Sequence, residues 1–457
     1  MKVMKFGGGC LRDGQSFIRI AKLLRDEPFG QTVIVVSAIN GVTNSLEQAT
    51  LSALESEGNI SRFIEDIRAL HENIIQSAIQ DPKTQEHIMK IIESKIRALE
   101  RLLYGISYTG EITDTVRVIV LSQGERLSAI ILAAVLSEHG KNARSFEADK
   151  IGIVTDTVCE NATANLSMVR TNLQENLVPL IRRGIIPVIT GFFGCTEDGK
   201  TSSFGRNGSD YSAAVIAHAL EAREVYIWKD VDGFMTADPG LVPSSKRIKH
   251  LSYMEAAELS YFGARILHPR TVEPLMGTNT RIYIKNIHSP KNAVTLIEES
   301  GHEEKDIVKS VTYNDKIAVL RIHGAGVGHK PGIIGEIGKT LSDARINIFS
   351  VLTSQTCINL LLDNKDAGRG IDALRPHVGG VIERLELRND VALIAVVGQG
   401  LGNREGLAAR VFSAVAQKSI NVEMFAAGAS HVAYYFIVAQ KDMQGSIAAV
   451  HDSFFGI

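Results

Sequence analysis

The sequence predicts an α/β protein with a mainly parallel sheet, a helical insert and, in the last third of the chain, two βαββαβ units. Three observations lead to this prediction. Short apolar runs alternate with helical stretches through the first two-thirds of the 457 residues. Residues 45–104 interrupt this alternation, and the last third repeats itself at a constant offset. Alternating strands and helices are typical of a layered fold with parallel strands.

Four short apolar runs are expected to form buried strands, at residues 3–6, 32–36, 187–190 and 225–228. Helices are expected at residues 16–24, 126–136 and 210–220. Ligands of parallel sheets bind at the carboxyl ends of the strands. We therefore expect the functional site in the loops that follow these strands.

Residues 45–104 predict a helical hairpin inserted into the α/β layer. Apolar side chains recur at helical spacing from Ile60 to Ala78 and again from Ile88 to Leu103. Asp81-Pro82 separates the two runs, because proline rarely continues a helix. We expect the hairpin to serve packing and not catalysis.

The last third contains an internal repeat. Gly324, Gly326, Gly328 and Gly332 recur 74 positions later as Gly398, Gly400, Gly402 and Gly406, and Ile346-Asn347 recurs as Ile420-Asn421. Each copy predicts a βαββαβ unit, but the second has no closing strand after its last helix. A strand at residues 307–313, before the first copy, is expected to supply it. Two such units side by side suggest a paired regulatory module.

Composition and charge exclude several classes of protein. The net charge is −2 and basic residues are spread along the chain, so neither nucleic acid nor a membrane surface is an expected partner. We find no apolar run long enough to span a bilayer, and no signal peptide is expected. The four cysteines form no CxxC pair, and the histidines show no ligand spacing. This pattern favours a reducing cytoplasm and predicts no metal site built by the protein.

A glycine run follows the first predicted strand. In Lys5-Phe6-Gly7-Gly8-Gly9 the glycines allow backbone N–H groups to approach phosphate oxygens, and the lysine adds a positive charge. A tight turn without a ligand explains the glycines equally well. Residues 194–201 also fit the P-loop pattern, but Glu197 and Asp198 would place carboxylates in a phosphate cradle. Asp198-Gly199 predicts a hairpin instead.

Charged residues near predicted helix starts could complete a site. Arg206 can fork onto a carboxylate, and Ser209 precedes a helix expected to begin at Tyr211. Asp210 could cap that helix or orient a cation. Gly124-Glu125 is expected to begin another helix, where the glutamate could bind a substrate ammonium group or complement the helix dipole.

Together these motifs resemble the aspartokinases of the amino-acid-kinase superfamily over nearly the whole chain. The repeat resembles the paired ACT domains of that family. The matching segments are Lys5-Phe6-Gly7-Gly8, Val36-Ser37-Ala38 with Val42-Thr43-Asn44, Gly124-Glu125, Gly191-Phe192, residues 206–210, Asp230-Val231-Asp232-Gly233 with Thr236-Ala237-Asp238-Pro239, and residues 262–264 through 267–271.

The resemblance implies a three-layer amino-acid-kinase sandwich and two ferredoxin-like ACT domains. The catalytic domain would span residues 1–300, with its helical insert at 45–104. The first ACT domain would span 316–388, and the second 305–315 plus 389–457.

The implied activity is ATP-dependent phosphorylation of the L-aspartate side chain to 4-phospho-L-aspartate, the first step of lysine, threonine and methionine biosynthesis. The resemblance also implies Mg²⁺, a cytoplasmic homodimer or larger assembly, and feedback by lysine or threonine. An aspartate carboxylate is already ionised at neutral pH, so its attack on phosphate needs no general base. We therefore expect Asp210 to organise Lys5 or the metal ion.

Site residues follow from the same resemblance. The catalytic pair would be Lys5 and Asp210, and aspartate would bind at Thr43, Glu125, Phe192, Arg206 and Ser209. The nucleotide site would include Gly7, Gly8, Ser37, Lys229, Asp230, Met235 and Arg265. The effector site would include Gly332, Ile333, Asn347 and Ile348.

Several positions on the nucleotide side depart from the family pattern. Gly9-Cys10 replaces Thr-Ser, Asn207 a glycine, Lys229 a threonine, Met235 an aromatic residue, Gly240 an arginine and Arg265 a lysine. We hypothesise that Lys229 replaces a lost phosphate contact; the alternative is that it points to solvent. Asn207 should tolerate the backbone angles of the glycine it replaces.

The sequence is compatible with three hypotheses about function. The first is an aspartate kinase with feedback control. The second is a sister kinase with another acceptor, such as glutamate or a carbamate. The third is a catalytically weak paralogue that senses an amino acid or serves as a partner subunit. Retention of Lys5, Glu125, Arg206 and Asp210 favours an active kinase.

Overall fold

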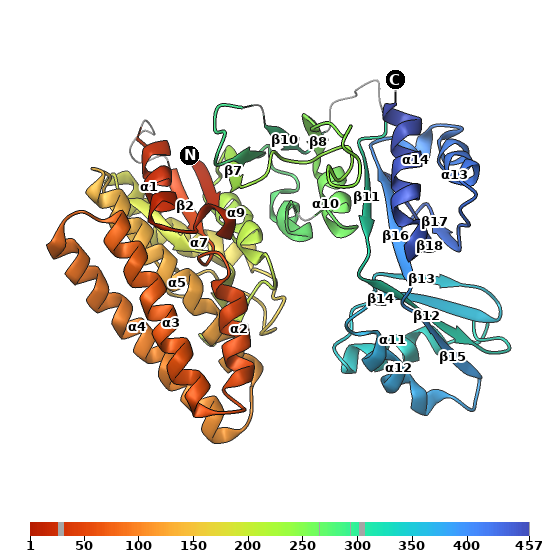
Figure 1. Cartoon of the computed structure of the whole chain (residues 1–457), viewed down its shortest axis with the longest axis horizontal. Helices are drawn as coiled ribbons and strands as arrows, with labels where there is room; N and C mark the ends of the chain where they lie inside the picture. Colours follow the sequence, from red (N-terminus) through yellow and green to blue (C-terminus); the bar gives the residue numbers. More distant parts are fainter. Residues whose placement is uncertain (26–31, 265, 293, 301–306, 457) are drawn as a thin grey trace. The chain divides into compact units, whose positions relative to one another are not determined.

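The computed structural model describes residues 1–25, 32–264, 266–292, 294–300 and 307–456 (Figure 1). The chain divides into two compact units. The first comprises Met1–Phe234, Lys249–Ala257 and Ile266–His302, and the second comprises Met235–Ile248, Glu258–Arg265 and Glu303–Ile457. Arg265, and residues 305, 306 and 457 of the predicted second ACT domain, lie outside the described residues. The domain boundaries derived from the sequence stay predictions.

An eight-stranded sheet with the order β3-β4-β2-β1-β7-β9-β10-β8 forms the centre of the first unit. Neighbouring strands are parallel except for β9 and β10, which are antiparallel. The mainly parallel α/β architecture is therefore confirmed. The strands are β1 (Lys2–Phe6), β2 (Thr32–Val36), β3 (Ala143–Phe146), β4 (Ile186–Thr190), β7 (Glu224–Lys229), β8 (His250–Ser252), β9 (Arg281–Asn286) and β10 (Thr295–Glu298).

The central strands β1, β2 and β4 are almost entirely buried, which explains why their sequences are continuous apolar runs. A separate small hairpin pairs β5 (Phe193–Cys195) with β6 (Thr201–Ser203). Its turn contains Asp198 and Gly199. The hairpin prediction is confirmed, and these residues form no P-loop.

Helices cover the sheet and build the insert. α5 packs on β2, β3 and β4, whereas α9 packs on β1, β2 and β7. The helices are α1 (Gly14–Leu23), α2 (Val42–Ser52), α3 (Glu57–Ala78), α4 (Pro82–Thr109), α5 (Asp114–Glu138), α6 (Ala148–Ile151), α7 (Leu166–Asn176), α8 (Val178–Arg182), α9 (Gly208–Ala219) and α10 (Tyr253–Tyr261), with 3-10 turns η1 (Gly8–Cys10) and η2 (Pro269–Leu275).

The predicted helical hairpin is confirmed as α3 and α4, which pack side by side (Figure 1). α4 begins where the sequence indicates. The Asp81 carboxylate accepts the backbone N–H of Thr84 at 2.9 Å, and Pro82 occupies the first turn, where its missing N–H costs nothing. α3 packs against α1 and α2, and α4 against α5, so the hairpin is joined to the α/β layer by its apolar faces.

The predicted start of a helix at Gly124-Glu125 is wrong. α5 begins ten residues before Gly124, at Asp114, and the Thr113 hydroxyl caps it. Gly124 lies in the helix interior. Glycine is needed there because the loop after β2 lies against this position: a Cβ would come within 2.6 Å of the Ala38 side chain. Glu125 therefore cannot complement the N-terminal dipole of this helix.

α5 also corrects the expectation that no apolar segment reaches membrane-spanning length. By length and composition this helix could cross a bilayer. However, 89% of its apolar window is buried inside the fold. Such burial is typical of the core helix of a globular domain.

The second unit contains two four-stranded sheets, one for each copy of the repeat. The first has the order β13-β14-β12-β15 and the second the order β11-β16-β18-β17. β11 precedes the first copy and pairs antiparallel with β16 of the second copy, so it takes the place of the missing strand. The strands are β11 (Ser310–Asn314), β12 (Ile317–His323), β13 (Ser350–Thr353), β14 (Cys357–Asp363), β15 (Arg384–Arg388), β16 (Val391–Val397), β17 (Met424–Ala426) and β18 (Ala433–Ala439).

Matching helices follow the glycine loops of the two copies. α11 (Ile333–Asp343) begins after Gly332 and α13 (Leu407–Gln417) after Gly406. Both glycines have left-handed backbone angles, with φ of 92° and 80°, which explains why glycine recurs there. The second helices of the copies are α12 (Ala367–Leu374) and α14 (Met443–Phe455).

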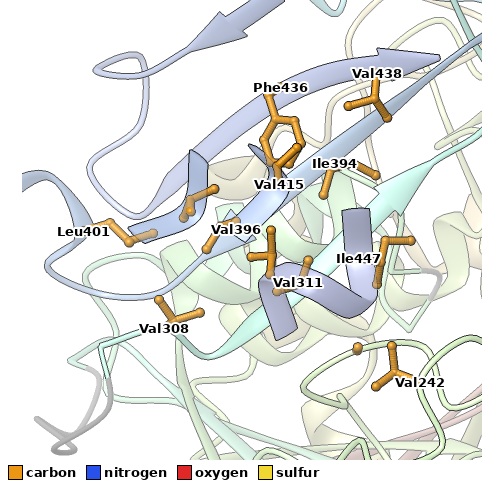
Figure 2. Packing of buried hydrophobic residues seen from close by; sticks show 13 residues of the cluster. Val242, Val308, Val311, Ile394, Val396, Leu401, Val415, Phe436, Val438 and Ile447 are labelled. Atoms are coloured by element: carbon orange, nitrogen blue, oxygen red, sulfur yellow. The ribbon is translucent and has the colours of Figure 1, made fainter. Parts of the chain in front are cut away.

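One hydrophobic core of the second unit joins the second sheet to a segment from the middle of the chain. Val242 packs with Val311, Ile394 and Ile447 (Figure 2). The same segment is held by hydrogen bonds, because the N–H of Val311 donates to the Thr236 carbonyl at 2.9 Å. Residues 235–248, which include Met235, are thus built into the second unit.

His71 of α3 gives a test of the packing in the insert. Its side chain is fully buried, and Nδ1 contacts the Ile67 carbonyl at 2.7 Å. Burial lowers the pKa of His71 to about 4, so folding keeps the ring neutral while the unfolded chain takes up a proton below its ordinary pKa. This difference leaves stability intact above about pH 6.5 and removes up to about 3 kcal/mol as the pH falls toward 4.

We expect His71→Gln, which can still donate to Ile67 but does not titrate, to lose less thermal stability than the native protein between pH 6.5 and 4. Melting temperatures measured across this range test the prediction. His87→Gln, at an exposed position of α4, is the matched control and should follow the native curve. Parallel curves for His71→Gln and the native protein would contradict the prediction.

Candidate active site

The centre of the candidate site is a buried carboxylate held between two lysines. Lys5 lies near the end of β1 and Lys229 at the end of β7, the neighbouring strand. Asp210 lies in the first turn of α9. Its Oδ1 is 2.7 Å from Lys5 Nζ and its Oδ2 is 3.0 Å from Lys229 Nζ. The backbone N–H of His268 also donates to Oδ2, at 3.3 Å.

Burial and the neighbouring charges act on the pKa values of Asp210 and Lys5 in opposite directions. Burial opposes ionisation of Asp210, but the charges of Lys229 and Lys5 outweigh it and lower the pKa of this carboxyl well below its ordinary range. Burial also lowers the pKa of Lys5, with the Asp210 charge opposing the shift and the Lys229 charge adding to it. With both lysines charged, the three side chains carry one surplus positive charge. Asp210 is thus poorly suited to be a base and well suited to hold two cations in place.

The position of Lys229 answers one question left open by the sequence. Its side chain is 17% exposed and paired with Asp210, so the alternative in which it points to solvent is wrong. Asp210 does not cap its helix, because α9 begins at Gly208 and Asn207 is the capping residue. Asn207 has a left-handed φ of 62°, as its replacement of a glycine requires.

The glycine run passes between the Lys5 side chain and Asp230. A Cβ on Gly7 would lie 3.3 Å from Lys5 Nζ, and one on Gly9 would lie 2.7 Å from the Asp230 carboxylate. Asp230 in turn forms an ion pair with Arg12. The Asp230 carboxylate therefore occupies the space that a side chain at position 9 would need. Cys10 is buried, and burial raises the pKa of its thiol to about 11.

Glu125 is a buried carboxyl group with no cation paired to it in the described structure. Its side chain is buried, and its Oε1 accepts the backbone N–H of Ala38 at 3.0 Å. Its Oε2 has no hydrogen-bond partner among the described residues. Ser128 fixes the same contact between helix and loop, because its hydroxyl donates to the carbonyl of Ser37 at 2.7 Å. Burial raises the pKa of Glu125 to about 8, with the Ala38 hydrogen bond opposing the shift.

The remaining residues predicted to bind the amino acid lie in the loop after β4, around the start of α9, and in α2. Gly191 packs so closely on Ser209 that a Cβ at position 191 would lie 2.7 Å from the serine side chain. Phe192 has a positive φ of 75°, and the hydroxyl of Ser212 accepts its N–H at 2.9 Å. Arg206 is 75% exposed and forms an ion pair with Glu47 of α2. Thr43 lies in the first turn of the same helix.

Other predicted residues are not brought into this cluster by the described structure. Met235 belongs to the second unit, and Arg265 lies outside the described residues. The predicted effector residues all lie in the first copy of the repeat: Gly332 and Ile333 start α11, while Asn347 and Ile348 precede β13. Sequence reasoning missed the backbone of His268, the Arg12–Asp230 pair and Glu47, because such contacts join positions far apart in the chain.

No group of three or more His, Cys, Asp or Glu side chains within the described ranges lies close enough together to hold a metal ion. The charged side chains near the glycine run are instead Lys5, Lys229 and Arg12, together with two carboxylates, Asp210 and Asp230, that already pair with them. This arrangement suits an anionic ligand and not a bare cation.

Comparison with known families supports a kinase fold and a regulatory module. The model of the amino acid kinase family matches residues 1–286, and the model of an ACT domain matches residues 394–454. The chain is 30% identical to aspartokinase 1 from the chloroplast of Arabidopsis thaliana, over 99% of this chain and 80% of that protein. It is 29% identical to a bifunctional aspartokinase/homoserine dehydrogenase of Buchnera aphidicola. The chain spans 56% of the length of that bifunctional relative.

Solved structures give the same picture. Aspartokinase III of E. coli in complex with aspartate and ADP matches with a TM-score of 0.86 at 25% identity, and each chain is covered completely. The complex of the same enzyme with lysine and aspartate matches with a TM-score of 0.79 at 26% identity, over 100% of this chain and 99% of that one. These are similarities of the whole chain and not of one domain.

Glu125 leads to a prediction about stability. Because its folded pKa lies above its ordinary value, stability is lost as the pH rises from about 4.5 toward 8, and the loss at pH 7 is about 3 kcal/mol. We expect Glu125→Gln to melt at a higher temperature than the native protein at pH 7.5, with the advantage disappearing near pH 4.5. Calorimetry of the ligand-free protein measures this difference.

The matched control is Glu111→Gln, at an exposed carboxylate just before α5. It should leave the melting temperature unchanged at both pH values. A melting temperature of Glu125→Gln at or below the native value at pH 7.5 would show that the carboxylate is compensated in the folded protein.

Proposed function

The chain belongs to the aspartokinases of the amino acid kinase family, and from this premise we propose that it transfers the γ-phosphoryl group of ATP to the side-chain carboxylate of L-aspartate, giving 4-phospho-L-aspartate. The observation that carries the proposal is the buried Asp210 between Lys5 and Lys229, next to the glycine run. Two anions must meet in this reaction, and the cluster offers a surplus positive charge where they would do so.

The residues of the cluster match the needs of a carboxylate acceptor. An aspartate side chain is ionised at neutral pH and needs no base to remove a proton. The obstacles are repulsion between the acceptor and the phosphates and the charge that develops on the transferred group. Lys5 and Lys229 reduce both, and Asp210 holds the two ammonium groups in position. A preorganised donor of this kind is typically worth about 3 kcal/mol in the transition state.

The proposed amino-acid site uses complementary charges. The unpaired Oε2 of Glu125 would accept the substrate ammonium group, which would remove the cost of burying this carboxylate. Arg206 would bind the α-carboxylate through its planar N–H edge. Thr43, Phe192 and Ser209 would shape the pocket around the bound amino acid.

The proposed nucleotide site lies at the ends of β1, β2 and β7. Gly7 and Gly8 would let the backbone approach the phosphates, and Ser37 and Asp230 would contribute further contacts. When Mg²⁺ accompanies ATP, the phosphate oxygens would supply most of its ligands, and the ion would neutralise part of their charge. The ADP complex of the E. coli relative supports nucleotide binding by this fold.

Regulation belongs to the same proposal. ACT domains are present in the second unit, and the E. coli relative has been solved with lysine bound. We propose that lysine or threonine binds at Gly332, Ile333, Asn347 and Ile348 and inhibits the first step of lysine, threonine and methionine biosynthesis. A cytoplasmic homodimer or larger assembly, associated through the ACT domains, fits this role.

An assay of ADP release with a panel of amino acids tests the proposed reaction. We expect release with ATP and L-aspartate, and inhibition when lysine or threonine is added. Release with glutamate or another carboxylate but not with aspartate would favour a sister kinase. The absence of release with every acceptor would favour an amino-acid sensor or a partner subunit, and either result would overturn the proposal.

Lys229 gives a prediction specific to this chain. Lys229→Thr restores the residue usual in the family but removes one of the two cations on Asp210. The loss of a charge-assisted contact to phosphate lowers the affinity about tenfold. We therefore expect the KM for ATP to rise about tenfold. The KM for aspartate should change little.

Steady-state kinetics with ATP varied at saturating aspartate measure this effect. Lys200→Thr, at an exposed lysine of the β5–β6 hairpin, is the matched control and should behave like the native enzyme. An unchanged or lower KM for ATP in Lys229→Thr would rule out a phosphate contact by Lys229.

A further inference from the structure

Glu47 lies one helical turn beyond Thr43 on the same face of α2, because residues four positions apart in a helix are neighbours. Thr43 belongs to the proposed amino-acid site. Glu47 is therefore close in the helix to that site, although no feature of the sequence marked it.

The two carboxylate oxygens of Glu47 bind two different arginines. Oε1 accepts from Arg117 Nη2 of α5, and Oε2 accepts from Arg206 Nη2 in the loop before α9. Arg117 also pairs through Nη1 with Glu160, at 2.9 Å. Two arginines and two glutamates thus form a chain of ion pairs with no net charge, and Arg206 is its last member.

Arg206 is the more exposed partner of its ion pair with Glu47. The arginine side chain is 75% exposed, whereas Glu47 is 24% exposed and is itself held by Arg117. A long exposed side chain samples many rotamers unless a partner fixes it. Only Nη2 of Arg206 is engaged by Glu47, so the guanidinium keeps further N–H groups on its planar edge for a second carboxylate.

We propose that Glu47 is a positioning residue that holds Arg206 ready for the α-carboxylate of the substrate. This inference rests on the proposed function, because it takes Arg206 as the residue that binds the amino acid. The substrate class is a free amino acid with an ionised α-carboxylate. Glu47 reduces the ordering that binding would otherwise require, so its contribution falls on substrate affinity and not on phosphoryl transfer.

The test compares Glu47→Ala and Glu47→Gln with the native enzyme. We expect the KM for aspartate to rise about tenfold in Glu47→Ala, which corresponds to about 1.4 kcal/mol, and less in Glu47→Gln, which keeps an acceptor for Arg206. The kcat and the KM for ATP should stay within twofold of native values. The melting temperature should equal that of the native enzyme. Glu160→Ala is the matched control, because it removes the other partner of Arg117 without touching Arg206.

Calorimetric titration of the same proteins with L-aspartate reads the affinity without turnover. Tighter binding to the native enzyme than to Glu47→Ala supports the inference. Equal binding, or a lower KM in Glu47→Ala, would overturn it and would indicate that Glu47 competes with the substrate for Arg206. Native turnover of aspartate with an unchanged KM in Glu47→Ala would overturn the inference alone, whereas the absence of both binding and turnover in the native enzyme would overturn the proposed function as well.

Discussion

The ion pairs of Asp210 with Lys5 and Lys229 are the interaction on which the geometry of the catalytic site depends. A buried carboxylate is stable only when it is paired, and the partners here come from β1 and β7, which are adjacent in the sheet. The first turn of α9 must bring Asp210 to the ends of both strands. Asn207 in its left-handed conformation and the backbone N–H of His268 complete that arrangement. The adjacency of β1 and β7 and the start of α9 together satisfy one requirement, the burial of a carboxylate between two cations.

Glu125 illustrates the opposite solution within the same site. Asp210 has a partner on each oxygen, whereas Glu125 is buried with one oxygen unsatisfied and a pKa raised to about 8. The two carboxylates differ because lysines surround one and the loop after β2 covers the other. Under the proposed function the two carboxylates therefore have different roles. Asp210 binds the ammonium groups of two lysines of the protein, whereas Glu125 would bind the ammonium group of the substrate. The cost of leaving Glu125 unpaired is the kind of local strain expected at a functional site.

The strands, the helical hairpin and the repeat could be predicted from the sequence, because each has a periodic pattern or a terminating residue such as Pro82 within a few positions. The sequence predicts the wrong start for α5 because glycine usually lies at the end of a helix. Gly124 lies in the helix interior, and only the close approach of Ala38 explains a glycine there. Lys229 and Glu47 show a second limit. Their partners Asp210 and Arg206 are fixed by strand order and helix packing, and side-chain type alone does not reveal which distant charge a residue will meet.

Under the proposed function, the positive cluster acts through charge and position, with Asp210 as organiser and no base required. The turnover of Lys5→Met at saturating ATP and aspartate tests it most directly, because methionine keeps most of the volume of the lysine side chain and leaves Asp210 paired with Lys229. We expect a fall in kcat of about a hundredfold or more, with the fold intact by its melting curve. Near-native turnover in Lys5→Met would contradict it.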